Sequence, residues 1–382
     1  NRVIGLYGTG DLTGVRFDGT SFMGGGTSGG AASSSSGVLL ESCSGAPDFV
    51  NASTFGGYGI GGIAGTRTAF EAEGASCRPR IDGGRHMGCE VGDTCTGIAC
   101  RTSAPCTVQN ATIYGSAASS TRIYGVRCLT GGCTSLTGNE IRAGGLANTG
   151  AEGIGLEIDG ASPAVDDNRI VGPNGGGMAM TPGRYHGIYL RRTSSLLTNN
   201  VVEAGSLGGA VEVIRFDVTT LGPALIEPTI HSNTIDYTAC TGCGARTGLA
   251  VAAGPGMMAG PAGVVRNNII RHTAAGGITM PVRELDVMAD FRVFENNDLY
   301  DPTSGGVYVD EGVTVLNIAQ VNATIGTGNI ATTCQLNATW HMPATSPCRN
   351  AGTATGAPDH DFDADRRPAE ALYDIGADEY IP

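Results

Sequence analysis

Charged side chains that can bind or cleave a sugar gather in the middle of the sequence. The candidates are Glu157, Asp159, Asp166, Asp167, Arg191, Glu212 and Arg215. A glycoside hydrolase needs two carboxylates that face one sugar, and a polysaccharide lyase needs a base and carboxylates that bind calcium against a uronate. The alternative is an exposed sheet face on which arginines and carboxylates pair between strands. We favour this alternative and keep the seven residues as candidate catalytic groups.

A second acidic group lies near the carboxyl end. Asp359, Asp361, Asp363 and Asp365 alternate with other residues, and Glu370 is the twelfth residue counted from Asp359. This spacing resembles a calcium-binding loop. The sixth position, which needs glycine, is an alanine, and two arginines follow shortly after it. We therefore expect a solvated acidic turn and no cofactor, with calcium as the alternative.

The 12 cysteines indicate disulfides and an oxidising, extracellular location. Local pairing predicts the bonds Cys43–Cys77, Cys89–Cys95, Cys100–Cys106, Cys128–Cys133, Cys240–Cys243 and Cys334–Cys348. Cys100 and Cys128 also occupy equivalent positions in neighbouring repeats. A rival scheme therefore joins Cys100 to Cys128 and Cys106 to Cys133, and the sequence leaves both open.

The charge balance argues against two classes of partner. All 23 basic residues are arginine, and the formal net charge is −13. Nucleic acids and anionic membranes require clustered positive charge, so we expect neither as a partner. No run of residues reaches the roughly 18 apolar positions of a membrane span. We expect self-association, other surface proteins or a polysaccharide as partners.

These residues lie on a repeat that is marked by asparagine. Short apolar strands flank Asn168, Asn200, Asn233, Asn268 and Asn297, which are 32, 33, 35 and 29 residues apart. Degenerate copies place Gly or Asn at the same point upstream, at Gly19, Asn51, Gly83, Asn110 and Asn139, and a last copy follows at Asn329. Such a residue tolerates the left-handed backbone of a sharp turn, and stacked asparagines can also hydrogen-bond from one copy to the next.

Each copy of about 30 residues supplies about three short strands and no long helix, which favours a stacked coil. We therefore predict an all-β, right-handed parallel β-helix of about 11 coils, disulfide-bonded, over residues 1–335, with a closing segment over 336–382. The aliphatic residues after the turn should stack inside, namely Ile141, Ile170, Val202, Ile235, Ile270 and Leu299. A second inward column should hold Cys100, Cys128, Ile158, Leu190, Val213, Val251, Met280 and Val309.

The repeat resembles the right-handed parallel β-helix proteins of the pectate-lyase-like superfamily. The carboxyl end resembles the closing segment of bacterial secreted proteins of the choice-of-anchor Q type. The residues that carry this likeness are S-P-C-R-N-A-G-T at 346–353 and D-A-D-R-R-P followed by D-I-G-A-D-E at 363–379. Asn350 stands where those proteins have Asp, and Ala364 where Gly is common. The resemblance implies an exported bacterial surface or extracellular protein and no defined activity.

We expect a non-enzymatic structural or adhesive protein of a bacterial cell surface. An uncovered coil end is an open sheet edge that must be capped or paired, so head-to-tail filaments are one form of this hypothesis. One alternative is a polysaccharide lyase or glycoside hydrolase that works on the outward face near Glu157. Another is a carbohydrate-binding surface protein without turnover.

Overall fold

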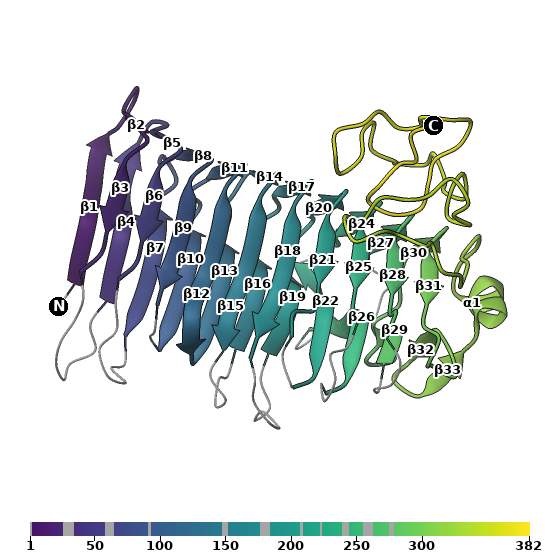
Figure 1. Ribbon diagram of the computed structural model, residues 1–382. Coiled ribbons are helices and arrows are strands. Elements are labelled where there is room, and N and C mark those ends of the chain that lie inside the picture. Colours follow the sequence, from purple (N-terminus) through teal and green to yellow (C-terminus); the bar gives the residue numbers. More distant parts are fainter. Residues whose placement is uncertain are drawn as a thin grey trace. The chain divides into compact units, whose positions relative to one another are not determined.

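The chain is an all-β parallel solenoid of about eight turns, each of about 32 residues. The computed structural model (Figure 1) describes residues 2–25, 34–57, 65–90, 93–146, 152–175, 184–206, 209–221, 224–238, 244–254, 263–274 and 279–382. The predicted fold class is confirmed. The turn count is slightly lower than the expected 11, and the copy around Asn329 forms only isolated bridges, at Thr327 and Ile330, instead of strands.

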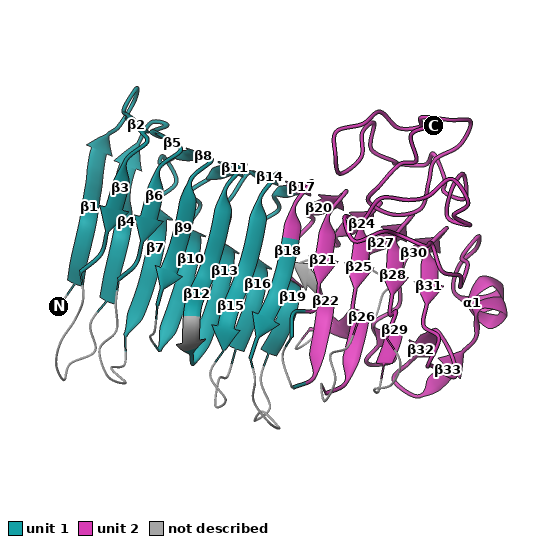
Figure 2. Cartoon of the chain, in the orientation of Figure 1, with its two compact units in different colours: residues 1–164, 170–189, 205–209 teal, residues 165–169, 190–204, 210–382 magenta. Residues whose placement is uncertain are grey.

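The chain divides into two compact units (Figure 2). The first comprises residues 1–164, 170–189 and 205–209, and the second comprises 165–169, 190–204 and 210–382. The sequence-based boundary at 335/336 lies inside the second unit. In both units the chain passes in each turn through one long strand and two short ones, and equivalent strands of successive turns pair in parallel.

The first unit contains three parallel sheets. Its long strands are β1 (Arg2–Asp11), β4 (Ser34–Ser44), β7 (Thr66–Glu73), β10 (Thr94–Arg101), β13 (Arg122–Leu129), β16 (Glu152–Asp159) and most of β19 (Arg184–Arg191). A second sheet holds β2 (Arg16–Asp18), β5 (Asp48–Val50), β8 (Arg80–Asp82), β11 (Thr107–Gln109) and β14 (Ser135–Thr137). The third holds β3 (Ser21–Met23), β6 (Ser53–Phe55), β9 (Arg85–Cys89), β12 (Thr112–Ser120), β15 (Glu140–Leu146) and most of β18 (Arg169–Asn174).

The second unit repeats this arrangement. Its longest sheet holds β22 (Val211–Leu221), β26 (Arg246–Ala253), β29 (Thr279–Glu284), β32 (Tyr308–Asp310) and β33 (Thr314–Leu316). The short sheets hold most of β17 (Ala164–Asp166), β20 (Leu196–Thr198), β24 (Thr229–His231), β27 (Val264–Arg266) and β30 (Val293–Glu295), and then β21 (Val201–Glu203), β25 (Thr234–Asp236), β28 (Ile269–Arg271) and β31 (Asp298–Tyr300). Antiparallel pairing joins β23 (Ala224–Ile226) to β22, and β33 to β32. The helix α1 (Ile318–Thr324) follows, capped by Asn317.

Stacked aliphatic side chains fill the interior, as the sequence predicts. The column after the turn is fully buried at all six expected positions, from Ile141 to Leu299. The column on the long strands is confirmed where Cys100 pairs with Cys128 and Cys128 with Ile158. It is wrong further on, because Phe216 lies opposite Val251 where Val213 was expected. Glu284, and not Met280, then lies opposite Val251.

The turn residue with a left-handed backbone is the predicted one in the early copies of the repeat but not in the later ones. In the early turns the prediction is correct, since Gly19 and Asn51 have φ of 59° and 49°. From the fifth copy onward the left-handed residue is the preceding one. In the second unit these residues form what we call the left-handed column: Asp167, Asn199, Ser232, Asn267 and Asn296, with φ between 52° and 56°.

The asparagines themselves form a buried ladder in the second unit, made of Asn168, Asn200, Asn233, Asn268, Asn297 and Asn329. From Asn200 to Asn329, each Oδ1 accepts hydrogen bonds from the backbone N–H and the Nδ2 of the asparagine one turn earlier, as between Asn200 and Asn168 at 3.0 Å. The amide ladder proposed from sequence is therefore confirmed. It satisfies polar groups inside an apolar core, which would otherwise cost about 1–3 kcal/mol each.

The disulfides follow the local pairing scheme. Bonds join Cys43 to Cys77, Cys89 to Cys95, Cys100 to Cys106, Cys128 to Cys133 and Cys334 to Cys348. Cys100 and Cys128 do lie opposite each other on neighbouring strands, yet each bonds to its local partner, so the rival scheme is wrong. The predicted bond between Cys240 and Cys243 lies outside the described residues.

Candidate functional site

The C-terminal segment, residues 336–382, runs along the left-handed column of the second unit (Figure 1). The Nδ2 groups of three turn asparagines donate to its backbone carbonyls: Asn296 to Ala351 at 3.1 Å, Asn267 to Thr353 at 2.8 Å and Asn199 to His360 at 3.1 Å. The Nε2 of His231, at the end of β24, lies 3.2 Å from the carbonyl oxygen of Thr355. The Oδ1 of Asn267 also accepts the N–H of Thr353 at 2.9 Å. Asparagine is therefore needed at these turns both for its left-handed backbone and for its side chain.

This path brings His360 onto two of the predicted site residues. The Nε2 of His360 lies 3.0 Å from Oδ2 of Asp166 and 3.4 Å from Oδ2 of Asp167. Its Nδ1 lies 2.8 Å from Oδ1 of Asp359. The side chains of Asp166, Asp167 and His360 are 22%, 16% and 32% exposed, so the cluster is partly shielded but open to solvent. We call these three residues the Asp–Asp–His cluster.

Residues of the next turn surround this cluster. Thr198 donates its hydroxyl to Oδ1 of Asp166 at 2.6 Å, and Nδ2 of Asn199 lies 3.3 Å from the same oxygen. Asn199 is completely buried. Its Oδ1 and the Oδ1 of Asp167 are buried atoms without a hydrogen-bond partner among the described residues. The cluster thus contains two buried oxygen atoms that accept no hydrogen bond from the described residues and can act as ligands of a cation.

The surroundings of Asp167 shift the pKa of its carboxyl group. Burial, together with the charge of Asp166, raises the pKa of Asp167 to about 7. Although burial alone lowers the pKa of His360, the bond to Asp359 and the charges of Asp167 and Asp166 raise it overall. A carboxyl group with a pKa of about 7 can exchange a proton near neutral pH, and carboxylates beside an imidazole can bind a cation.

Glu157, which the sequence predicted to point outward, lies in the first unit and is only 3% exposed. Its Oε2 accepts a hydrogen bond from Nε of Arg127 at 2.7 Å, and its Oε1 lies 3.8 Å from Arg184. Arg127 also stacks on the ring of Tyr124, 4.0 Å from its centroid. Glu157 is therefore held between two arginines. Asp159 lies half-buried at the end of the same strand.

The remaining candidates lie in the second unit. The guanidinium of Arg215 bonds Glu212 at 3.0 Å and Asp217 at 2.9 Å, all within β22. Arg191 is half-buried at the end of β19. The structure thus brings Asp166 together with Asp167, and Glu212 together with Arg215.

The four aspartates considered for calcium have different surroundings. Asp361 is buried and accepts the N–H groups of Asp363 and Asp365 with one oxygen and that of Glu379 with the other. Asp359, whose side chain is 96% exposed, bonds His360, and Asp363 lies 3.3 Å from His341. Asp361 therefore organises the fold of the segment, and calcium binding by this series stays an untested prediction.

Two other clusters contain residue types that bind metals. His341 bonds Asp378 at 3.1 Å and lies 3.3 Å from Asp363, but the other oxygen of Asp378 accepts the N–H of Met342. Asp298 lies 3.0 Å from Sγ of Cys334, which is in a disulfide. Burial raises the pKa of Asp298 to about 8, so this carboxyl group is neutral below that pH. Disulfide sulfurs are not metal ligands, which rules out this third cluster as a metal site.

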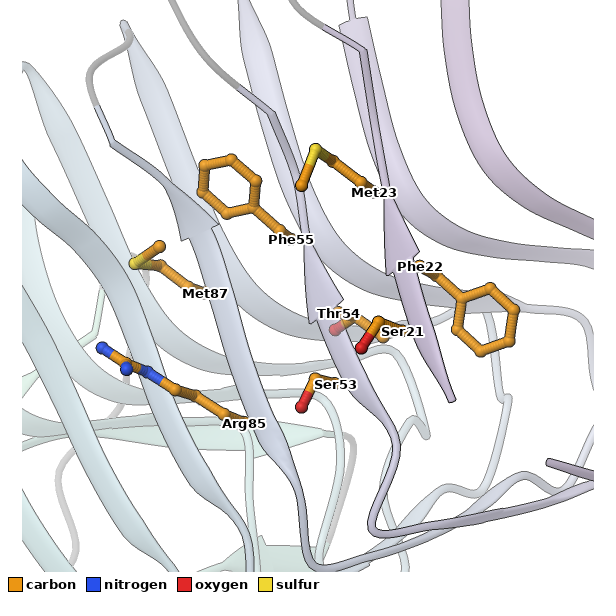
Figure 3. A pocket seen from close by; sticks show the side chains of 8 residues that line it. All are labelled: Ser21, Phe22, Met23, Ser53, Thr54, Phe55, Arg85 and Met87. Carbon is orange, nitrogen blue, oxygen red and sulfur yellow. The ribbon is translucent and has the colours of Figure 1, made fainter. Parts of the chain in front are cut away.

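The outer face of the third sheet of the first unit carries a shallow hollow of about 280 Å³ (Figure 3). Met23, Phe55 and Met87 project from β3, β6 and β9 on the same side, with Arg85 at one margin. Met23 is 60% exposed. The guanidinium of Arg85 also lies 5.2 Å from the centre of the Tyr114 ring. This apolar hollow is not evident in the sequence, because Met23, Phe55 and Met87 are 32 positions apart and belong to the degenerate copies.

His360 was also missed, because 194 residues separate it from Asp166. Its local signal is that aspartates flank it on both sides, which holds for none of the other five histidines. Among the described residues, no helix has the length and apolar character needed to cross a membrane. No known protein family matches the chain, and no curated protein is significantly similar to it.

Proposed function

We propose that this chain is a non-enzymatic extracellular solenoid of a bacterial surface with a structural or adhesive role. The observation that carries the proposal is the pairing of its charged side chains from one turn to the next. In the first unit these pairs are Arg2 with Glu41 and Glu71, Arg101 with Glu71, Arg127 with Glu157, and Arg184 with Glu152 and Glu157. Glu157, one of the carboxylates considered for catalysis, is part of this network.

Arginine suits such a network because its planar guanidinium has five donors in a rigid fork. One arginine can therefore bind carboxylates of two successive turns, as Arg2 does with Glu41 of β4 and Glu71 of β7. Each exposed pair contributes little, but a network of partly buried pairs contributes more. The amide ladder inside and the arginine network outside both join successive turns, which favours a stiff scaffold.

Five disulfides support the extracellular location. The repeat supports membership of the pectate-lyase-like superfamily, and the closing sequence D-I-G-A-D-E supports a closing segment of the choice-of-anchor Q type. Its Asp374 and Glu379 lie inside the folded C-terminal segment, where Arg367 is buried beside Glu379. Self-association into filaments belongs to the same proposal, and electron micrographs of the purified chain distinguish separate from stacked particles.

The test of the non-enzymatic role is a screen for cleavage of uronate-containing and neutral glycans, with and without calcium. We expect no cleavage by the wild-type chain and none by Glu157→Gln or Arg191→Ala. Glycan cleavage by the wild type that either substitution abolishes would replace the scaffold role with a lyase or hydrolase. Glu140→Gln is the matched control, because Glu140 pairs only with Arg142 of its own strand.

A second candidate is the binding of an acidic glycan without turnover, and the hollow around Phe55 favours it. An apolar floor can pack against the face of a sugar ring, while Arg85 can pair with a uronate carboxylate. Ser21 and Ser53 add hydroxyl groups to the same hollow. Oligogalacturonate titrated by calorimetry tests this candidate. We expect Arg85→Ala to abolish binding and Arg16→Ala, an exposed arginine paired with Asp18, to preserve it.

A further inference from the structure

We propose that the Asp–Asp–His cluster is a zinc site that fastens the C-terminal segment to the solenoid turns of the second unit. The ligands are Oδ2 of Asp166, Oδ2 of Asp167 and Nε2 of His360. Two of them come from the turn after β17, and the third comes from the C-terminal segment. The site differs from the aspartate series considered for calcium, and it does not depend on the proposed function.

The distances between the ligand atoms fit a tetrahedral ion. Zinc binds imidazole nitrogen and carboxylate oxygen at about 2.0–2.2 Å, so two ligands of a tetrahedral site lie about 3.4 Å apart. The Nε2 of His360 lies 3.0 Å from one carboxylate oxygen and 3.4 Å from the other. All three ligand atoms lie within 4.8 Å of one another. Small side-chain movements are therefore enough to close the site around an ion.

A buried oxygen donor without a partner lies beside these ligands. Asn199 is 0% exposed, and its Oδ1 has no hydrogen-bond partner among the described residues. Its Nδ2 lies 3.3 Å from Asp166, so the amide group borders the cluster. A buried carbonyl oxygen left unpaired destabilises the fold. A cation, or the water that it carries, satisfies this oxygen together with the free Oδ1 of Asp167.

The charges around the cluster also favour a cation. Three carboxylates, those of Asp166, Asp167 and Asp359, surround one imidazole. The charges that act on Asp167 come from Asp166, His360 and Asp361, two of them negative. A divalent ion neutralises this excess, and the bond from Nδ1 of His360 to Asp359 orients the imidazole as second-shell carboxylates do in zinc sites.

The ligand types select zinc over calcium. Calcium and magnesium prefer sites made only of oxygen donors, whereas imidazole favours zinc and the later transition metals. Three protein ligands leave a fourth position for water. Equivalent positions on the neighbouring strands hold Thr198, His231 and Arg266 in place of Asp166. Of these strands, β17 is the one whose turn presents two adjacent carboxylates.

The test uses the complete chain, stripped with a chelator and titrated with Zn²⁺ by calorimetry. We expect one tight equivalent, and we expect His360→Gln and Asp167→Asn each to weaken it at least about tenfold, since loss even of an outer-shell partner costs that much. His341→Gln is the matched control, because His341 also lies between two carboxylates of the C-terminal segment. It should leave the affinity for this equivalent unchanged.

Cobalt provides a second readout that does not depend on how well the variants fold. Co²⁺ bound to the wild-type chain should show the visible absorption bands of a tetrahedral ion with nitrogen and oxygen ligands. X-ray absorption of the zinc form should show one imidazole. The proposal is overturned if the wild-type chain binds no zinc, if the metal spectrum lacks an imidazole, or if His341→Gln removes the tight equivalent while His360→Gln retains it.

Discussion

Asn233 accepts two hydrogen bonds from Asn200 through one oxygen, from the backbone N–H and from Nδ2, both at 2.9 Å. The Nδ2 of Asn233 in turn reaches Oδ1 of Asn268 at 3.0 Å and the carbonyl of Leu197 at 3.0 Å. One side chain thus joins three successive turns. Because these groups are buried, water cannot replace the bonds when the side chain is removed.

Asn233→Gly should therefore destabilise the second unit strongly. The substitution leaves the backbone N–H and Nδ2 of Asn200 without their acceptor, at about 1–3 kcal/mol each. We expect a loss of roughly 3 kcal/mol or more in the free energy of unfolding, measured by urea titration. Asn51→Gly is the matched control, since Asn51 is exposed and has a φ of 49°, which glycine adopts easily. Equal effects of the two substitutions would contradict the ladder's role.

Much of this architecture can be predicted from the sequence because each turn repeats the same residue types. The asparagine spacing and the aliphatic residue two positions later identify the turns and one inward column, from Ile141 to Leu299. The register of the long strands is harder to predict where the glycine that marks them is replaced. Gly248 marks β26, but the residue opposite it is Val213 on β22 and Pro281 on β29. The predicted register was therefore wrong on these strands.

The asparagine pairs show a second limit of the sequence. In N-N pairs such as Asn267–Asn268, either residue can adopt the left-handed conformation. The structure assigns it to the first, because the second is held inside by the ladder. The contact between Asp166 and His360 is likewise invisible in sequence. It depends on the path of a segment without regular strands, which no residue period encodes.

Glu157→Gln should destabilise the first unit moderately. The change removes the charge that pairs with Arg127 and Arg184, and leaves a buried amide beside two arginines. The arginine side chains are 19% and 37% exposed, so water partly replaces the lost contacts. We expect a loss of about 1–2 kcal/mol by urea unfolding. Glu140→Gln, in a half-buried pair with Arg142 inside one strand, should cost less than about 1 kcal/mol. A neutral Glu157→Gln would show that the network adds no stability.

The buried carboxyl group of Asp298 should make the stability of the chain depend on pH. Burial raises its pKa from 3.8 to about 8, so the folded chain keeps a proton that the unfolded chain releases. The protonated carboxyl group contributes on the order of several kcal/mol to the free energy of unfolding. This contribution is complete below about pH 4 and is lost as the pH rises through about 8. Asp298→Asn, which stays neutral, should equal the wild type at pH 4 and exceed its stability at pH 9.

The control for this pH dependence is Asp301→Asn, because hydrogen bonds and His272 hold the pKa of Asp301 low in spite of partial burial. That substitution should destabilise the chain at pH 9 instead of stabilising it. Unfolding monitored by circular dichroism across the pH range gives both curves. Parallel curves for the wild type and Asp298→Asn would contradict a protonated carboxyl group at this position.

Asn267→Gly should release part of the C-terminal segment without disturbing the turn. Glycine keeps the left-handed backbone of Asn267, whose φ is 52°. It removes two hydrogen bonds to the backbone of Thr353, at 2.8 and 2.9 Å. Each bond contributes about 0.5–1.5 kcal/mol to holding the segment closed. When cleavage follows local opening, proteases should therefore cleave the segment around residues 351–358 roughly fivefold to a hundredfold faster. Asn51→Gly, with a similar backbone and an exposed side chain, should leave this rate unchanged. If the two variants are cleaved at the same rate, the left-handed asparagines serve the turns alone and do not hold the segment.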